Sequence, residues 1–203
     1  MDMTVEDLER TVNSDLTTVV KKSAISFGQL ILETNIEDLY STILYLKTNL
    51  KCRFRQLIDI TAVDYPEQEK RFKIVYFLLS HENNLRVIIN AHIEENVLTP
   101  SIIKIFPSAN WMEREVFDMY GIKFKDHPNL KRILTDYGFE GHPLRKDFPL
   151  TGHTEVRYSE DKKKIISEPI KLNQEYRKFD SQSPWEGTKY IREEKKETEK
   201  KND

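Results

Sequence analysis

The stretch FKIVYFLLSHENNLRVIINAH, residues 72–92, decides the fold of this 203-residue chain. Its first eight residues are nearly continuous in apolar side chains, which predicts a strand buried on both faces. A second strand is predicted over 85–92, and the polar HENN between the two runs is typical of a hairpin connection. The stretch therefore predicts two strands joined as antiparallel neighbours.

Segments on the N-terminal side extend this pattern. Residues 25–32 and 54–63 place apolar side chains at strand-like spacing. Residues 36–46 carry them at helical spacing, and Asn35 is a candidate N-cap for that helix. A short amphipathic helix is predicted over 4–20. Together these segments predict a short helix, a strand and a second helix before the three strands over 54–63, 72–79 and 85–92.

A further helix is predicted from the residues that follow position 109. Asn110, with Glu113 three residues later, has the pattern of a capping box at a helix start. Gly121 is predicted to end this helix in the left-handed conformation. Arg114 and Asp118 are four residues apart, so an ion pair is expected on the exposed side of the helix.

This order of elements predicts an α+β fold: a mostly antiparallel sheet with helices packed on one face, followed by a long extended C-terminal segment. No sustained periodicity follows residue 124, although a hairpin is predicted within residues 155–166. Five of the six glycines and five of the eight prolines lie at Gly121 or beyond. The chain is therefore divided into an N-terminal helical extension (1–20), a globular domain (21–124), an extended partner-wrapping segment (125–187) and a charged tail expected to be disordered (188–203).

Composition excludes several classes of protein. The formal net charge of -2 opposes nucleic-acid binding, despite basic clusters such as Lys162 to Lys164. No apolar run approaches the roughly 18 residues of a membrane span. The single cysteine, Cys52, rules out an intrachain disulfide and a zinc or iron–sulfur site built from this chain's thiolates alone. Its cationic neighbours could activate Cys52, but a small buried hydrophobe is the favoured interpretation.

The stretch 111–150 concentrates the groups that chemistry would use. One interpretation is a free-standing metal- or carboxylate-dependent hydrolase that uses the 113–118 and 142–147 clusters, with Glu113, Glu115 and His142 in the active site. The histidines of this region are far apart on irregular chain, however, and no recognisable metal-ligand spacing is present. No catalytic residue, cofactor-binding residue or metal ligand is therefore predicted.

The alternative interpretation is a surface that another protein covers. Phe139, Leu144, Phe148, Leu150 and Trp185 are large apolar residues in a segment without a core of its own. Exposed patches of this kind mark protein interfaces. The charged run from 145 to 147 could supply paired contacts around them. This interpretation accounts for more of the segment than the hydrolase does.

Several motifs resemble one family, the 30-kDa-type subunit of respiratory complex I (its C subunit), in the mitochondrial and alpha-proteobacterial branch. The motifs are EREVFDMYGI at 113–122, HPNLKRIL at 127–134, YGFEGHPLRKDFPL at 137–150, EVRY at 155–158, Glu168-Pro169 and SPWE at 183–186. The resemblance spans roughly residues 25–187. The Lys/Glu tail after Gly187 has no counterpart in it.

The resemblance implies a non-catalytic subunit in the peripheral arm of the proton-translocating NADH:ubiquinone oxidoreductase. It also implies that FMN and the iron–sulfur clusters are held by partner subunits, and that the C-terminal segment wraps the neighbouring quinone-module subunit. The expected location is the matrix side of the mitochondrial inner membrane, or else the cytoplasmic face of a bacterial inner membrane. The N-terminal residues show no signal or transit peptide.

The hypothesis of a partner interface also names specific residues. They are Arg114, Glu115, Asp118, Phe139, His142, Arg145, Lys146, Asp147, Phe148 and Trp185.

Overall fold

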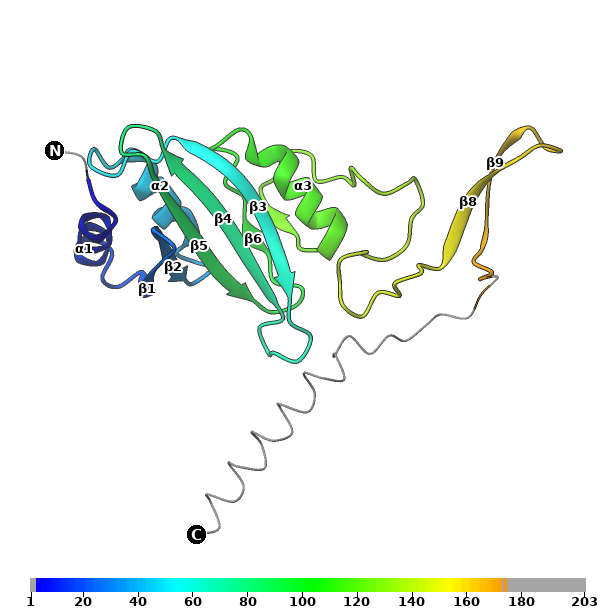
Figure 1. Cartoon of the computed structure of the whole chain (residues 1–203), viewed down its shortest axis with the longest axis horizontal. Coiled ribbons are helices and arrows are strands. Elements are labelled where there is room, and N and C mark those ends of the chain that lie inside the picture. The colour runs from blue at the N-terminus through cyan, green and yellow to red at the C-terminus, as the bar shows by residue number, and fades with distance from the viewer. Residues whose placement is uncertain (1–2, 173, 175–203) are drawn as a thin grey trace, which may run out of the picture. The chain divides into compact units, whose positions relative to one another are not determined.

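The computed structural model describes residues 3–172 and 174, which form parts of two compact units (Figure 1). The first unit comprises Met1–Gly152 and the second His153–Asp203. The predicted globular domain ended at residue 124, whereas the first unit continues to 152. Trp185 and the predicted charged tail lie outside the described residues.

A five-stranded sheet is the centre of the first unit. Its strands are β1 (Val20–Ser26), β2 (Gln29–Thr34), β3 (Gln56–Asp64), β4 (Phe72–Ser80) and β5 (Leu85–Ile93). They lie in the order β1-β2-β5-β4-β3, and every neighbouring pair is antiparallel except β2 with β5. The hairpin predicted from residues 72–92 is confirmed as β4 and β5.

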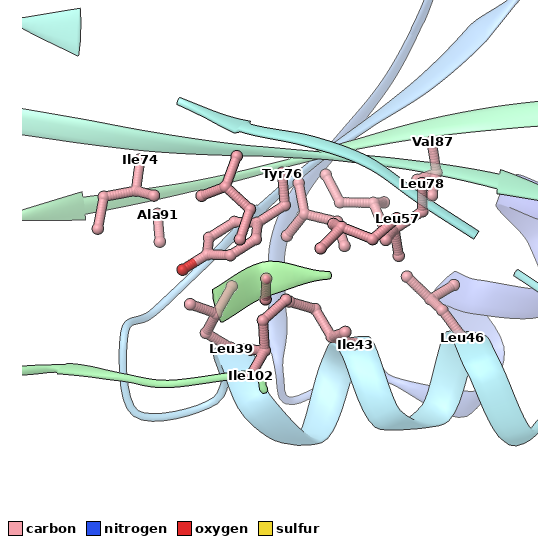
Figure 2. Packing of buried hydrophobic residues seen from close by; sticks show 14 of the residues in the cluster. Leu39, Ile43, Leu46, Leu57, Ile74, Tyr76, Leu78, Val87, Ala91 and Ile102 are labelled. Carbon is pink, nitrogen blue, oxygen red and sulfur yellow. The ribbon is translucent and has the colours of Figure 1, made fainter. Parts of the chain in front are cut away.

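Two helices cover one face of this sheet, and a third lies beside β1 and β2. The helices are α1 (Val5–Asp15), α2 (Leu39–Thr48) and α3 (Ala109–Tyr120). Figure 2 shows Leu39, Ile43 and Leu46 of α2 beneath the β4 side chains Tyr76 and Leu78. On the same face, α3 packs against β3, and the rings of Tyr120 and Phe72 form a T-shaped pair. The predicted α+β class is therefore confirmed.

The two faces of β4 differ in burial. Its even-numbered side chains, from Phe72 to Ser80, are buried beneath the helices. On the other face Val75 is buried, whereas Lys73, Phe77 and Leu79 are only half-buried. The prediction of full burial on both faces was wrong, because α2 and α3 share one face of the sheet.

Some element boundaries differ from those expected. The helix predicted over 4–20 ends at Asp15, and residues 20–26 form β1. The strand predicted over 25–32 is split by a turn at Phe27 and Gly28, both with positive φ. Asn35 is not an N-cap, since α2 begins at Leu39 without any side-chain cap. Local propensity located these elements but not their ends.

The remaining elements are short. β6 (Thr99–Pro100) and β7 (Phe124–Lys125) form a parallel pair. In the chain, β6 precedes α3 and β7 follows it. In the second unit, β8 (Thr154–Ser159) and β9 (Lys164–Pro169) form the hairpin expected within 155–166. Among the described helices, none combines the length and the apolar character needed to cross a membrane.

Candidate functional site

Asp118, near the C-terminal end of α3, organises the segment that returns over this helix. We call residues 125–150 the strap. The buried carboxylate accepts the backbone N–H groups of Ile133, Leu134 and Thr135 at 2.9, 2.8 and 3.0 Å. Its Oδ1 accepts the Thr135 hydroxyl at 2.7 Å and lies 3.3 Å from Arg132 Nη1. Burial alone would raise the pKa of Asp118, but these hydrogen bonds outweigh it and lower the pKa to about 2.

The prediction of an exposed ion pair between Arg114 and Asp118 was therefore wrong. Arg114 donates instead to the carbonyl oxygens of Lys131 and Arg132, at 3.0 and 3.2 Å, and its guanidinium stacks over the Trp111 ring. Both side chains of the predicted pair hold the strap. Several hydrogen bonds to a distant segment outweigh one ion pair along a helix surface, which contributes only about 0.2 to 0.5 kcal/mol.

Glu113 does not cap its helix, so the predicted capping box was also wrong. α3 begins at Ala109, and Ser108 before it makes no side-chain cap. The Glu113 side chain is fully buried, and its Oε1 accepts the backbone N–H of Ile102 at 2.8 Å. The carboxyl group thus fixes the loop after β6 rather than the start of its own helix.

The second half of the strap is attached to the end of α3. His142 Nδ1 donates to the Asp118 carbonyl oxygen at 2.9 Å, and Leu144 N–H donates to the Met119 carbonyl at 3.1 Å. Arg145 Nε donates to the Tyr120 carbonyl at 2.6 Å. These bonds use carbonyl groups that a helix C-terminus leaves without partners inside the helix. The strap therefore completes the end of α3.

A charge network joins the same part of the strap to the loop end of the β3–β4 hairpin, where β3 ends and β4 begins. Asp64, fully buried, pairs with Arg71 through two hydrogen bonds of 2.8 and 3.0 Å and accepts Lys146 N–H at 2.7 Å. Arg71 also lies 2.9 Å from Asp147, and Arg145 lies 2.7 Å from Glu95. Burial acts to raise the pKa of Asp64, but the bonds from Arg71 and Lys146 lower it overall. Buried charges are stable only when paired in this way.

Gly121 lies at the centre of these contacts. It ends α3 with φ of 79°, as predicted. A Cβ atom at this position would stand 2.7 Å from both Arg145 Nη2 and His142 Nε2. The strap can approach the helix end this closely only because residue 121 has no side chain.

The structure divides the predicted interface residues into four groups. Trp185 is outside the described residues. Glu115 and Lys146 have exposed side chains, and Phe139 and Phe148 pack against each other with ring centroids 5.9 Å apart. The others make contacts within the chain itself: Arg114, Asp118, His142, Arg145 and Asp147.

Within residues 111–150, three large exposed side chains were missing from the predicted set. Tyr137 and Leu134 lie on the strap, 108% and 61% exposed, and Trp111 lies on α3. Leu144 and Leu150, which the sequence did indicate, are exposed as well. Leu134 and Tyr137 lie in an aperiodic segment with no core of its own, and this position could have identified them as interface residues. The same criterion was applied to Phe139 but not to them.

The residues of the hydrolase alternative do not meet in one site. Glu113 is buried and Glu115 exposed, as expected for residues two apart on a helix. His142 is bonded to the end of the helix. Within 3–172 and 174, no group of three or more metal-ligating side chains is arranged to hold an ion. Cys52 is buried, and burial raises the pKa of its thiol to about 11, in agreement with the unreactive interpretation.

These observations define a class of protein: an α+β domain whose charged groups anchor its own strap, while large apolar groups on the strap face outward. The family described as "Respiratory-chain NADH dehydrogenase, 30 Kd subunit" matches residues 32–154. The chain belongs to this family, and the resemblance seen in its motifs is confirmed.

Relatives from alpha-proteobacteria match almost the whole chain. The C subunit of the NADH-quinone oxidoreductase of Methylobacterium radiotolerans is 50% identical over 190 residues, which cover 94% of this chain and 88% of the relative. The protein of the same name from Ruegeria sp. (strain TM1040) is 51% identical over 187 residues, 92% of this chain and 93% of its own length.

A solved structure shares the fold at much lower sequence identity. It comes from the membrane-bound sulfane sulfur reductase, an archaeal respiratory membrane complex, and matches with a TM-score of 0.63 and 22% identity. The match covers 71% of this chain and 85% of that chain. At this identity the similarity concerns the fold alone.

Proposed function

We propose that this chain is a non-catalytic subunit of the peripheral arm of proton-pumping NADH:ubiquinone oxidoreductase, where it buttresses the neighbouring quinone-module subunit. Membership of the family supports the assignment to the complex. The observation that carries the structural role is the strap. Its Arg132, Arg145 and Asp147 form ion pairs within the chain. Four of its large apolar side chains are exposed, namely Leu134, Tyr137, Leu144 and Leu150.

The exposed apolar side chains of the strap are expected to be more stable in contact with a partner protein than in contact with water. Tyr137 and Leu150 are 108% and 83% exposed, and Leu134 and Leu144 are exposed near them in sequence. Meanwhile Asp118 fixes the backbone from 133 to 135. A rigid backbone that presents aromatic and aliphatic side chains loses little conformational entropy on binding, which favours affinity. We infer that the side chains of Leu134 and Tyr137 are buried against the surface of the partner subunit.

The hairpin of the second unit has the same character. Val156, Tyr158 and Ile165 are exposed and, by strand alternation and register, share one of its faces. Arg157 and Glu168 form an ion pair on the opposite face, at 2.7 Å. A two-stranded hairpin is at best marginally stable alone in water. A partner that covers the apolar face would stabilise it, which supports the partner-wrapping role proposed for 125–187.

The partner role predicts an assembly defect from a change at the strap surface. In the double variant Leu134→Ser/Tyr137→Ser, the amount of assembled peripheral arm should fall at least about threefold, since exposed anchors of this kind can each contribute more than about 1 kcal/mol to binding. The turnover of each complex that does assemble should stay near normal. Native gels and NADH:ubiquinone activity per assembled complex measure the two quantities.

The matched control is Glu140→Ser, an exposed polar position on the same strap. The melting temperatures of both variant chains should remain close to that of the wild type, because the replaced side chains are exposed. Normal assembly combined with lost turnover would contradict the buttressing role and point to a role in the chemistry.

The proposal also predicts that the cofactors belong to the partners. The purified chain should show no flavin or iron–sulfur absorbance and no NADH oxidation, because we place FMN and the clusters in other subunits. Absorbance spectroscopy and metal analysis after native purification test this. A stoichiometric flavin or metal on the isolated chain would overturn the non-catalytic assignment.

We place the chain at the membrane surface as a peripheral subunit of the complex. The relatives described above are bacterial, and they support the cytoplasmic face of a bacterial inner membrane. The matrix side of the mitochondrial inner membrane stays a prediction from the resemblance. In either case the contact with the membrane is made through partner subunits.

A further inference from the structure

Three buried polar atoms around the first half of α3 have no hydrogen-bond partner among the described residues: Glu113 Oε2, Tyr76 Oη and Asn110 Oδ1. Glu113 and Tyr76 are fully buried. Buried polar atoms are almost always hydrogen-bonded to protein or to ordered water. Glu113 Oε2 is a carboxylate oxygen, the most costly of these atoms to leave without a partner, and the groups that surround Glu113 indicate what that partner is.

The three atoms belong to one region of the interior. Asn110 and Glu113 are three apart on α3 and share a side of the helix. Glu113 Oε1 is bonded to Ile102 N–H, and Figure 2 shows the Tyr76 ring pointing from β4 towards the side where Ile102 lies. The charge of Glu113 also acts on the Tyr76 hydroxyl. The unpartnered oxygens thus lie between α3, β4 and the loop after β6.

No cation from the described part of the chain balances Glu113 in this region. His127, from the loop after β7, lies 4.0 Å from Glu113 Oε2. Its Nδ1 accepts Asn129 N–H at 3.0 Å, so its proton is on Nε2, which faces the Asn110 carbonyl oxygen at 3.2 Å. A histidine with this bonding is neutral. Within residues 3–172 and 174, no lysine or arginine forms an ion pair with Glu113.

The described groups that face Glu113 are consequently all uncharged. They are the Tyr76 hydroxyl from β4, the Ser101 hydroxyl and Ile102 amide from the loop after β6, the His127 ring, and Asn110 on α3 itself. Burial raises the pKa of Glu113 from 4.5 to about 7, although hydrogen bonds from Ile102 and Ser101 partly oppose this rise.

We propose that Glu113 and Tyr76 form an internal site for a proton and a water molecule, in which Glu113 is held as a neutral carboxylic acid. The Glu113 Oε2–H donates to the water, and the water is shared with the Tyr76 hydroxyl. This arrangement gives both of these unpartnered oxygens a partner, since a buried water needs two to four polar neighbours. Ionisation leaves an unpaired charge in the core, so the loop that Glu113 holds through Ile102 becomes easier to open.

The site makes folding depend on pH in a defined direction. The folded chain binds one proton more than the unfolded chain between about pH 4.5, the usual pKa of a glutamate, and about pH 7. This contribution to stability is complete below 4.5 and is lost as the pH rises through 7. Within that window the unfolding equilibrium constant should rise by up to about tenfold per pH unit.

The test compares the full chain with Glu113→Gln, and Glu115→Gln on the exposed side of α3 is the matched control. Urea unfolding from pH 5 to pH 8 should show the extra proton in the wild type and in Glu115→Gln but not in Glu113→Gln. The infrared band of a protonated carboxylic acid should be present at pH 6 in the first two proteins and absent from the third.

Two results would overturn the proposal. One is an unchanged pH dependence of unfolding in Glu113→Gln. The other is the absence of a protonated carboxyl band at pH 6 in the folded wild-type chain, and this second result decides the matter even if Glu113→Gln fails to fold. A band that is present and titrates near pH 7 in both the wild type and Glu115→Gln supports the site.

Discussion

Replacing Asp118 by alanine is expected to destabilise the isolated chain by about 3 to 5 kcal/mol, because removing one partner of a buried charge network leaves the others unpaired. The carboxylate accepts three backbone N–H groups and the Thr135 hydroxyl, and it faces Arg132. Without it, those N–H groups lose their acceptor. Urea unfolding at pH 7 measures the loss, and Glu115→Ala on the exposed side of the helix should change stability by less than about 0.5 kcal/mol.

The same carboxylate predicts a particular response to acid. Because the folded chain lowers the pKa of Asp118 from 3.8 to about 2, its contribution to stability is present above pH 3.8 and is lost as the pH falls towards 2. The difference in stability between wild type and Asp118→Ala should shrink over this range. A difference that is below about 1 kcal/mol at pH 7, or that does not decrease in acid, would contradict the central role given to Asp118.

Opening of the strap should precede global unfolding in this variant. The 133–135 backbone is held to α3 through the Asp118 carboxylate, whereas His142 and Arg145 bind the end of the helix through backbone carbonyl groups that the substitution leaves in place. We therefore expect protease cleavage near Tyr137 to accelerate more than cleavage within the β4–β5 hairpin. Local opening of this kind is governed by the contacts of one segment, not by the stability of the whole domain.

The parts of the fold that the sequence predicted are those fixed by local chemistry. The β4–β5 hairpin follows from two apolar runs around a polar turn, and the end of α3 follows from the conformational freedom of Gly121. The β8–β9 hairpin was found in the same way. In each case the residues that set the structure are neighbours along the chain, so their pattern is visible without any tertiary contact.

The candidate site was misjudged where a distant segment decides the role of a residue. Spacing along the helix suggested that Arg114 would pair with Asp118, but the strap supplies both with better partners fourteen to eighteen residues away. The spacing from Asn110 suggested a capping role for Glu113. Its carboxyl group instead binds the loop at Ile102, which lies before the helix in the chain. A four-residue spacing carries no information about such returning segments. Only the packed structure brings these partners together.

The second large effect is expected from Gly121→Ala. A residue with a Cβ atom in the left-handed conformation costs about 1 to 2 kcal/mol, and Gly121 has φ of 79°. The new methyl group would also stand 2.7 Å from Arg145 Nη2 and His142 Nε2, closer than such atoms can approach. Relieving this overlap should add about 1 to 3 kcal/mol, the usual cost of overpacking. We expect a total loss of about 2 to 5 kcal/mol in the free energy of unfolding.

Gly138 provides the control that separates the two contributions. Its φ of 78° is nearly the same, but no described atom lies within 4 Å of the position that its Cβ would occupy. Gly138→Ala should therefore show the backbone cost alone, and the excess in Gly121→Ala measures the crowding by the strap. On an Arg145→Ala background, the cost of Gly121→Ala should decrease, because one of the overlapping groups is gone. Equal costs for the two glycine variants would mean that the strap does not press against the end of α3. In that case the closeness of the strap to the helix could not be what requires glycine at position 121.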